Sequence, residues 1–205
     1  RTWGASLQTL SRRSTASAYA IGWKLLAVSI SDICAMAATP IGAVISIHLP
    51  ISTDVEWMKE FYQGVSDLAK REGVFVLGGD TVRSTELAFC LTAWGTATKA
   101  PVLRSGAQPG DDVWVSGEIG ASYLGLEILE SRLSPNDLPD GGKRVIAVHC
   151  SPQPRSDIAR YLLARDDIHS MIDVSDGLLQ DAQRLVTSGG FDLLIDITSV
   201  PFVAE

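Results

Sequence analysis

The chain has 205 residues, of which 46% are hydrophobic, enough to build the core of one large domain or two small ones. Seventeen basic against 24 acidic side chains give a net charge of −7, and the absence of a basic stripe excludes nucleic acid as a main partner. Three widely spaced cysteines, Cys34, Cys90 and Cys150, show no metal-ligand spacing, so we expect reduced core residues in a cytoplasmic protein.

Residues 1–20 differ in composition from the remainder of the chain. They contain Arg1, Arg12 and Arg13, several serines and threonines, and no acidic residue. Organelle transit peptides have a similar composition. We therefore treat residues 1–20 as an atypical or displaced N-terminal segment, ahead of a domain over 21–100 and a partial second domain over 101–205.

The stretch from residue 25 to residue 47 is apolar and long enough to span a bilayer. However, Asp32 stands within it, and Pro40 and Gly42 divide it. This pattern predicts a buried helix that runs to Ala38 and then a strand over 43–49, and it argues against a membrane protein.

The next elements follow from local signals. Thr53 to Glu56 has the form of a capping box, apolar residues then recur at helical spacing, and Gly73 ends the predicted helix. The apolar run that follows predicts a short strand that stops at Gly78 and Gly79 and presents Asp80 at its carboxyl end. A simple Gly-Gly-Asp turn would explain the same residues.

The remaining chain predicts alternating strands and helices after a strand over 87–97 and a domain boundary near residue 101. We expect strands at 112–116, 170–174 and 191–197, and helices at 121–133, 145–150, 156–164 and 177–188. The predicted fold class is α/β (α+β) in two domains.

Four aspartates have settings that suggest chemistry. A lone Asp32 in an apolar helix is costly to bury unless it is paired or binds a metal. Asp173 and Asp176 bracket a strand-to-helix junction, where they either converge on one site or serve as a backbone partner and a helix cap. Together with Asp80 they form a set of hard ligands that suits Mg²⁺ and phosphate chemistry, although no Walker A loop is present.

A series of motifs in one order carries a resemblance to a known family. The chain resembles the thiamine-monophosphate kinases, which are members of the aminoimidazole-ribonucleotide-synthetase-like superfamily. The motifs cover nearly everything from Ile21 onward, and they are Gly22-Trp23-Lys24, Ser31-Asp32 with Ala35-Met36-Ala37, Gly78-Gly79-Asp80-Thr81, Leu103-Arg104-Ser105-Gly106-Ala107, Pro152-x-Pro154-Arg155 and Ile172-Asp173-Val174-Ser175-Asp176-Gly177-Leu178.

The resemblance implies ATP-dependent phosphorylation of thiamine phosphate to thiamine diphosphate by a homodimer with a two-domain fold. It implies Mg²⁺ ligands at Asp32, Asp80, Asp173 and Asp176, and ATP contacts at Gly79, Asp80, Arg104 and Ser175. Because the acceptor phosphate is already anionic, no catalytic general base is expected.

The chain also departs from the family pattern. Residues 1–18 do not match the family's early metal-binding motifs, with Gly4 about where a metal-binding Asp is expected, and the family continues past Glu205. We therefore expect little or no kinase activity from this chain. A non-catalytic nucleotide-binding or dimerisation remnant, or another ATP-using member of the same superfamily, remain alternatives.

Overall fold

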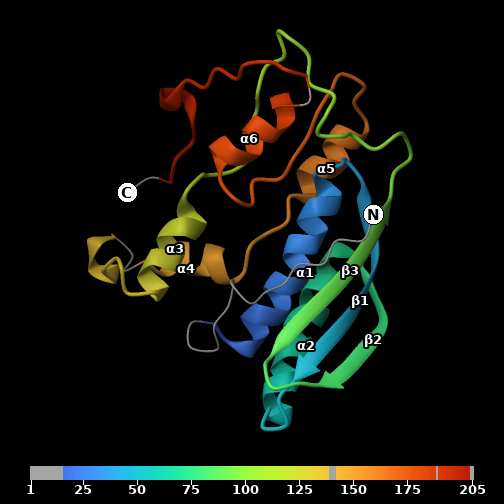
Figure 1. Cartoon of the computed structure of the whole chain (residues 1–205), viewed down its shortest axis with the longest axis vertical. Helices are drawn as coiled ribbons and strands as arrows, with labels where there is room; N and C mark the ends of the chain where they lie inside the picture. The colour runs from blue at the N-terminus through green and yellow to red at the C-terminus, as the bar shows by residue number, and fades with distance from the viewer. Residues whose placement is uncertain (1–15, 139–141, 188, 204–205) are drawn as a thin grey trace.

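The structure is a computed structural model that describes residues 16–138, 142–187 and 189–203. Figure 1 shows a three-stranded sheet with two long helices packed against it, and a second part built from shorter helices and long loops. This mixed α/β architecture confirms the predicted fold class. The expectations for residues 1–15 lie outside the described residues.

Helix α1 (Ala18–Cys34) is the central element of the first half. The Ser17 hydroxyl caps it by accepting a hydrogen bond from the Ala20 amide at 3.2 Å, so the helix begins inside the stretch that we set apart by composition. It ends four residues before the predicted Ala38, and Ala37 then adopts a left-handed φ of 50°. Among the described residues, no helix is long and apolar enough to cross a bilayer.

The sheet has the strand order β2-β1-β3, with β1 (Thr39–Leu49) parallel to β2 (Phe75–Arg83) and antiparallel to β3 (Ala88–Thr96). Ala43, Ile45 and Ile47 of β1 are buried and alternate with less buried residues, as expected for a strand with one face on a core. Figure 1 shows α1 and α2 (Val55–Glu72) on that covered side.

Helix α2 confirms the predicted amphipathic helix, with one correction at its start. The N-cap is Asp54, whose side chain accepts from the Glu56 amide, and not Thr53. Gly73 ends the helix in a left-handed conformation, as predicted. The buried face of α2 reaches the sheet through Phe61, whose ring stacks on Phe89 with centroids 4.6 Å apart.

The predicted end of β2 at the two glycines is wrong. The strand continues through Gly78, Gly79 and Asp80 to Arg83, with a register shift opposite Ala43 and Val44. A Cβ added to Gly79 would lie 1.7 Å from the Ile45 carbonyl oxygen. The glycine therefore lets two strands pair closely and does not end one of them. Asp80 lies inside the ladder, opposite Ser46.

The second half contains the predicted helices but not the predicted strands. Its helices are α3 (Ala121–Leu129), α4 (Lys143–Cys150), α5 (Ser156–Leu163) and α6 (Leu178–Thr187), with 3-10 turns η2 (Pro135–Asp137) and η3 (Ile197–Ser199). The segments 112–116, 170–174 and 191–197 form no ladder, and within the described residues this half has one isolated bridge, between Ile119 and Phe202. A strand needs a neighbouring strand to satisfy its backbone groups, and in the described part of the chain these segments make isolated backbone contacts, such as Met171 with Leu103, instead of a ladder.

The core is concentrated in the first half. One large cluster joins α1, α2 and the sheet, and it includes Ala159 from α5, so α5 docks onto the first half. Among the described residues, the second cluster contains three buried residues, Ala121, Ile128 and Val145. Of the three unpaired cysteines, Cys34 is buried and Cys150 half-buried, as expected. Cys90 is exposed, because it pairs with Ser46 in a part of the sheet that the helices leave uncovered.

Candidate functional site

Three segments distant in sequence meet beside the end of α1. The Val102 amide donates to the Met36 carbonyl at 3.1 Å, and the Met171 amide donates to the Leu103 carbonyl at 3.4 Å. Gly106 lies so close to the chain at His169 that a Cβ there would be 1.9 Å from the His169 carbonyl oxygen. These contacts place the Arg104 segment between α1 and the segment that carries Asp173.

The two halves share a carboxylate pair at this junction. Ser31 of α1 donates a hydrogen bond from its hydroxyl to Asp173 Oδ2 at 3.2 Å. Its neighbour Asp32 lies near enough to Asp173 for the two charges to act on each other. Desolvation, and secondly Asp173, raises the pKa of Asp32 to about 6, while Arg104 lowers it. A carboxylate whose charge is disfavoured by a neighbouring carboxylate is a group that a bound cation would stabilise.

Asp32 differs from its predicted setting. It lies in the last turn of α1 and is exposed, not buried in the middle of an apolar helix. Its raised pKa therefore reflects partial desolvation at the junction and the like charge of Asp173. Because Asp32 is exposed, solvent screening reduces the effect of this shift on the free energy of unfolding. Asp173 is half-buried, and its pKa is raised mainly by desolvation, while the Ser31 hydrogen bond lowers it.

Sequence reasoning missed Asp181, which organises the turn after Asp173. Asp181 is fully buried in the first turn of α6, at 0% exposure. Its Oδ2 accepts hydrogen bonds from the amides of Ser175, Asp176 and Gly177 at 2.8, 2.9 and 3.2 Å. The only indication in the sequence is that Asp181, a charged residue, occupies a position of the predicted helix where an apolar side chain facing the core would be expected.

Asp176 and Ser175 are both exposed on this turn. Asp176 accepts from Arg184 Nη2 at 2.7 Å, and Arg184 Nη1 contacts Asp181 Oδ1 at 2.5 Å. Asp176 is therefore an ion-pair partner in this structure. The pKa of Asp173 is raised by the negative charges of Asp181 and Asp176 after its larger causes, which places these groups in one electrostatic neighbourhood.

Gly79 and Asp80 lie in another part of the molecule. Their strand partners are Ile45 and Ser46, and Ser46 is about 20 Å along β1 from Thr39, where that strand begins beside the end of α1. Asp80 Oδ1 accepts from the Thr81 amide at 2.8 Å. Among the described residues, no group of three or more metal-ligating side chains gathers, so the structure does not bring the four predicted aspartates together.

The Gly-Trp-Lys motif joins the two halves of the chain through Trp23 and Lys24. Trp23 Nε1 donates to the Pro152 carbonyl at 2.9 Å, and Lys24 Nζ lies 3.2 Å from His149 Nε2 in a buried contact. His149 Nδ1 lies 3.0 Å from the Ser122 carbonyl oxygen. A neutral His149 that donates from Nδ1 to this carbonyl would accept from Lys24 at Nε2, which is consistent with both distances.

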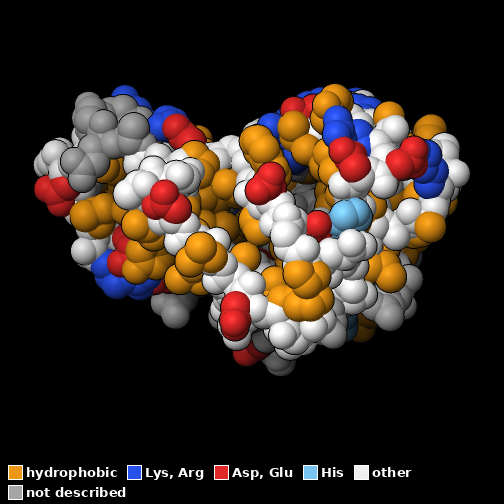
Figure 2. All heavy atoms as spheres, turned by 90° about the horizontal axis from the view of Figure 1, so that it is seen from above, with side chains coloured by type: hydrophobic (Ala, Val, Ile, Leu, Met, Phe, Trp, Pro, Cys, Tyr) orange, Lys and Arg blue, Asp and Glu red, His pale blue; other side chains and the backbone are white. Residues whose placement is uncertain are grey.

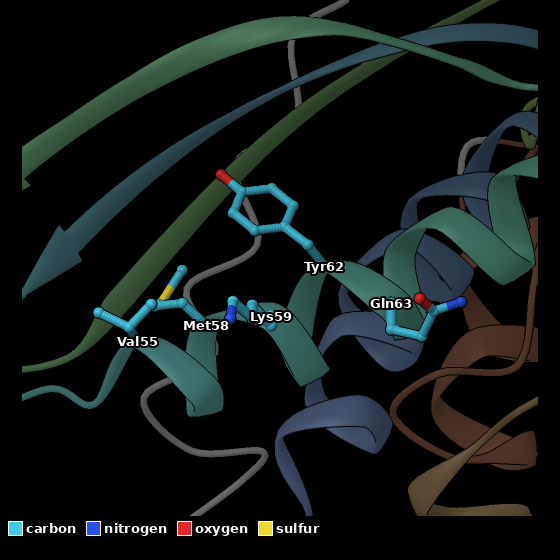
Figure 3. Close-up of a pocket in the computed structure, with 5 residues that line it drawn as sticks. All are labelled: Val55, Met58, Lys59, Tyr62 and Gln63. Atoms are coloured by element: carbon cyan, nitrogen blue, oxygen red, sulfur yellow. The ribbon is translucent and has the colours of Figure 1, made fainter.

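The surface also carries a hollow that the predicted site residues do not line. A hollow on α2 is lined by Val55, Met58, Lys59, Tyr62 and Gln63, and Figure 3 shows these side chains on one helix beside the sheet. None of them is a predicted site residue or a carboxylate. In the view from above, acidic, basic and hydrophobic side chains are interspersed, and no continuous basic area covers this face (Figure 2).

Two family models match consecutive parts of the chain. The model for the AIR synthase related protein, N-terminal domain, matches residues 4–97, and the model for the C-terminal domain of the same family matches residues 108–205. Between them the two models account for nearly the whole chain.

Individual relatives are thiamine-monophosphate kinases. That of Escherichia coli K12 is 36% identical over 183 residues, which are 89% of this chain and 55% of the relative. The solved structure of thiamine-monophosphate kinase from Stenotrophomonas maltophilia is 30% identical at a TM-score of 0.88, over 99% of this chain and 65% of that one. A structure of AaThiL complexed with AMPPCP and TMP is 30% identical at a TM-score of 0.83, over 92% and 59%.

The chain spans about half the length of the curated relatives that it matches. The match nevertheless covers both family domains in order, and the fold carries the same two parts. The chain therefore belongs to the AIR synthase related protein family.

Proposed function

We propose that this chain carries part of the active site of a kinase that transfers the γ-phosphoryl group of ATP to thiamine phosphate, giving thiamine diphosphate. The relatives at 31–36% identity are thiamine-monophosphate kinases, and the similar AaThiL structure is complexed with AMPPCP and TMP. The observation that carries the proposal is the pairing of Asp32 with Asp173 where the two halves of the chain meet.

The donor set at this junction fits Mg²⁺. Asp32 and Asp173 offer hard oxygen ligands, and Ser31 orients the second carboxylate. Mg²⁺ commonly binds one or two carboxylates and completes its shell with water and substrate phosphates, so a cage of three protein ligands is not required. When bound, Mg²⁺ would neutralise phosphate charge during transfer.

The other predicted residues have separate parts in the proposal. Arg104 lies close enough to lower the pKa of Asp32, and its guanidinium suits a phosphate oxygen pair. Ser175 would contact ATP, and Asp176 would become a metal ligand only after release from Arg184. Gly79 and Asp80 on β2 would contact ATP or a cation at a distance from the Asp32–Asp173 pair.

The reaction needs alignment more than acid-base chemistry. An anionic oxygen of thiamine phosphate forms a bond to the γ-phosphorus, and the bond from that phosphorus to the β–γ bridging oxygen breaks, so that ADP leaves with the electron pair. Since the nucleophile carries no proton that must be removed, the residues of the site have to hold two phosphate groups in line and offset their charge.

We further propose a homodimer in the cytoplasm, with a division between domains near residue 100. All nine residues of edge strand β2 are exposed, including Phe75 at 70% and Leu77 at 67%. An edge of this kind is suited to pairing with another chain. Sedimentation velocity over a range of protein concentrations tests this part, and a monomer at every concentration would contradict it.

Calorimetry with the 205-residue chain tests the main proposal. We expect Mg²⁺-dependent binding of AMPPCP that is lost in Asp32→Asn and Asp173→Asn and retained in Asp192→Asn, an exposed carboxylate in the second half. Incubation with ATP and thiamine phosphate, followed by chromatography for thiamine diphosphate, then separates catalysis from binding alone. Absence of nucleotide binding by the wild-type chain would overturn the proposal.

A further inference from the structure

We propose that Asp181 is a positioning residue that holds the turn at residues 175–177 and so sets the orientation of the Asp173 and Asp176 carboxylates. The part of this inference that concerns cation binding rests on the proposed kinase function. The part that concerns the turn rests on hydrogen bonds alone.

A single oxygen of Asp181 serves three consecutive amides. Oδ2 accepts from Ser175, Asp176 and Gly177, while Oδ1 contacts Arg184 at 2.5 Å. A carboxylate that is 0% exposed requires such partners, because a buried charge without them is costly. Both carboxylate oxygens of Asp181 therefore have partners: Oδ2 accepts from the three backbone amides, and Oδ1 contacts Arg184.

The three amides form the arrangement by which backbone groups often bind anions. Here their anion is internal, because Asp181 occupies the position that a phosphate would take. The backbone of the turn thus faces inward, while the side chains of Ser175 and Asp176 are exposed. A nucleotide at this turn would meet the Ser175 hydroxyl and the aspartates, not the three amides.

Arg184 extends the same arrangement to the exposed side. It bridges buried Asp181 and exposed Asp176, with Nη2 at 2.7 Å from Asp176 Oδ2. Asp181 therefore holds Asp176 in two ways. It accepts a hydrogen bond from the Asp176 backbone amide, and it contacts the Arg184 side chain that pairs with the Asp176 carboxylate. Asp173 lies two residues before the first held amide, so its direction also depends on the turn.

Two variants separate these tasks. Asp181→Ala removes all acceptors, whereas Asp181→Asn keeps an oxygen for the amides and places an amide group against Arg184. Amide hydrogen exchange followed by NMR reads the turn directly. We expect exchange at residues 175–177 to accelerate about 100-fold in Asp181→Ala and about tenfold in Asp181→Asn, with Asp192→Asn unchanged.

Binding of Mn²⁺ in the presence of AMPPCP, followed by electron paramagnetic resonance, supplies the second readout. We expect affinity to fall in the same order, about 100-fold and about tenfold, while core amides of α1 such as Leu25 and Ile30 keep their exchange rates. Partial recovery in Asp181→Asn is the result that a general loss of stability would not give.

Three outcomes would overturn the inference. Unchanged exchange at 175–177 in both variants would show that Asp181 does not hold the turn. Faster exchange there with unaltered Mn²⁺ affinity would remove its positioning role. Equal acceleration of the α1 core amides in both variants would reduce Asp181 to a structural residue. If wild-type chain binds no Mn²⁺, the proposed function fails, while the exchange data still decide what holds the turn.

Discussion

The Ser31 hydroxyl donates to Asp173 Oδ2 at 3.2 Å and so connects residues 142 positions apart in the sequence. Ser31 lies on the last turns of α1, next to Asp32, and Asp173 lies in the second half of the chain. This hydrogen bond directly links the two segments from which the candidate site is built.

Replacement of Ser31 by alanine tests this link. Because the hydrogen bond lowers the pKa of Asp173, its removal should raise that pKa further and weaken Mn²⁺–AMPPCP binding about tenfold. Ser29→Ala is the matched control, since the Ser29 hydroxyl bonds to the Leu25 carbonyl of its own helix. Equal affinities for the two variants, measured by calorimetry, would count against the link.

The carboxyl of Asp32 should make stability depend on pH. Its pKa is raised from 3.8 to about 6, first by desolvation and then by Asp173. Between these values the native state holds a proton that the unfolded state releases, so the free energy of unfolding should fall as pH rises from about 4 to about 6. Because Asp32 is exposed, solvent screening should limit this fall in the free energy of unfolding to about 1 kcal/mol.

Asp32→Asn should remove this dependence and make the chain about 1 kcal/mol more stable at pH 7 in the absence of divalent cations. Urea unfolding at pH 4.5 and at pH 7 measures the difference. An identical pH dependence for wild type and variant would assign the effect to other groups.

The buried contact between Lys24 and His149 should respond to acid. Burial, and secondly Lys24, lowers the pKa of His149 below 6.5, and burial lowers the pKa of Lys24. The unfolded chain therefore binds a proton that the native state resists, and stability should fall as pH drops below 6.5. Lys24→Met removes the like charge, so the pKa of His149 should rise and the acid sensitivity should shrink.

Titration of the His149 ring by NMR measures this change. Lys70→Met, on the exposed surface of α2, serves as the control for loss of one positive charge. A His149 pKa that moves equally in both variants would show that long-range charge, and not the 3.2 Å contact, controls it.

The adjacent glycines of β2 provide a matched pair of backbone variants. Gly78 and Gly79 have φ of 147° and 156°, so alanine is strained at either position. A Cβ at Gly79 would also lie 1.7 Å from the Ile45 oxygen, while nothing lies within 4 Å of one at Gly78. We expect Gly79→Ala to cost about 3 kcal/mol more than Gly78→Ala in urea unfolding. Equal costs would mean that the β1–β2 ladder accommodates a Cβ at Gly79 with little loss of stability.

The sequence by itself determined most of the helices, because their signals are local. Amphipathic spacing and Gly73 predicted α2 almost to its ends, and amphipathic spacing also predicted α3. The helices predicted at 145–150, 156–164 and 177–188 lie close to α4, α5 and α6. The order of motifs was also sufficient to identify the family, since a fixed order of short motifs needs no knowledge of the contacts between them.

Only the tertiary structure decided what the polar residues and the glycines do. Gly79 was interpreted as a strand end, yet its role is set by the Ile45 carbonyl of a neighbouring strand. Asp32 was expected to be buried, Asp181 was overlooked, and Asp80 was grouped with aspartates from which the fold separates it. The sequence shows the chemical type of each side chain. Its partners and its exposure depend on segments that meet only when the chain folds.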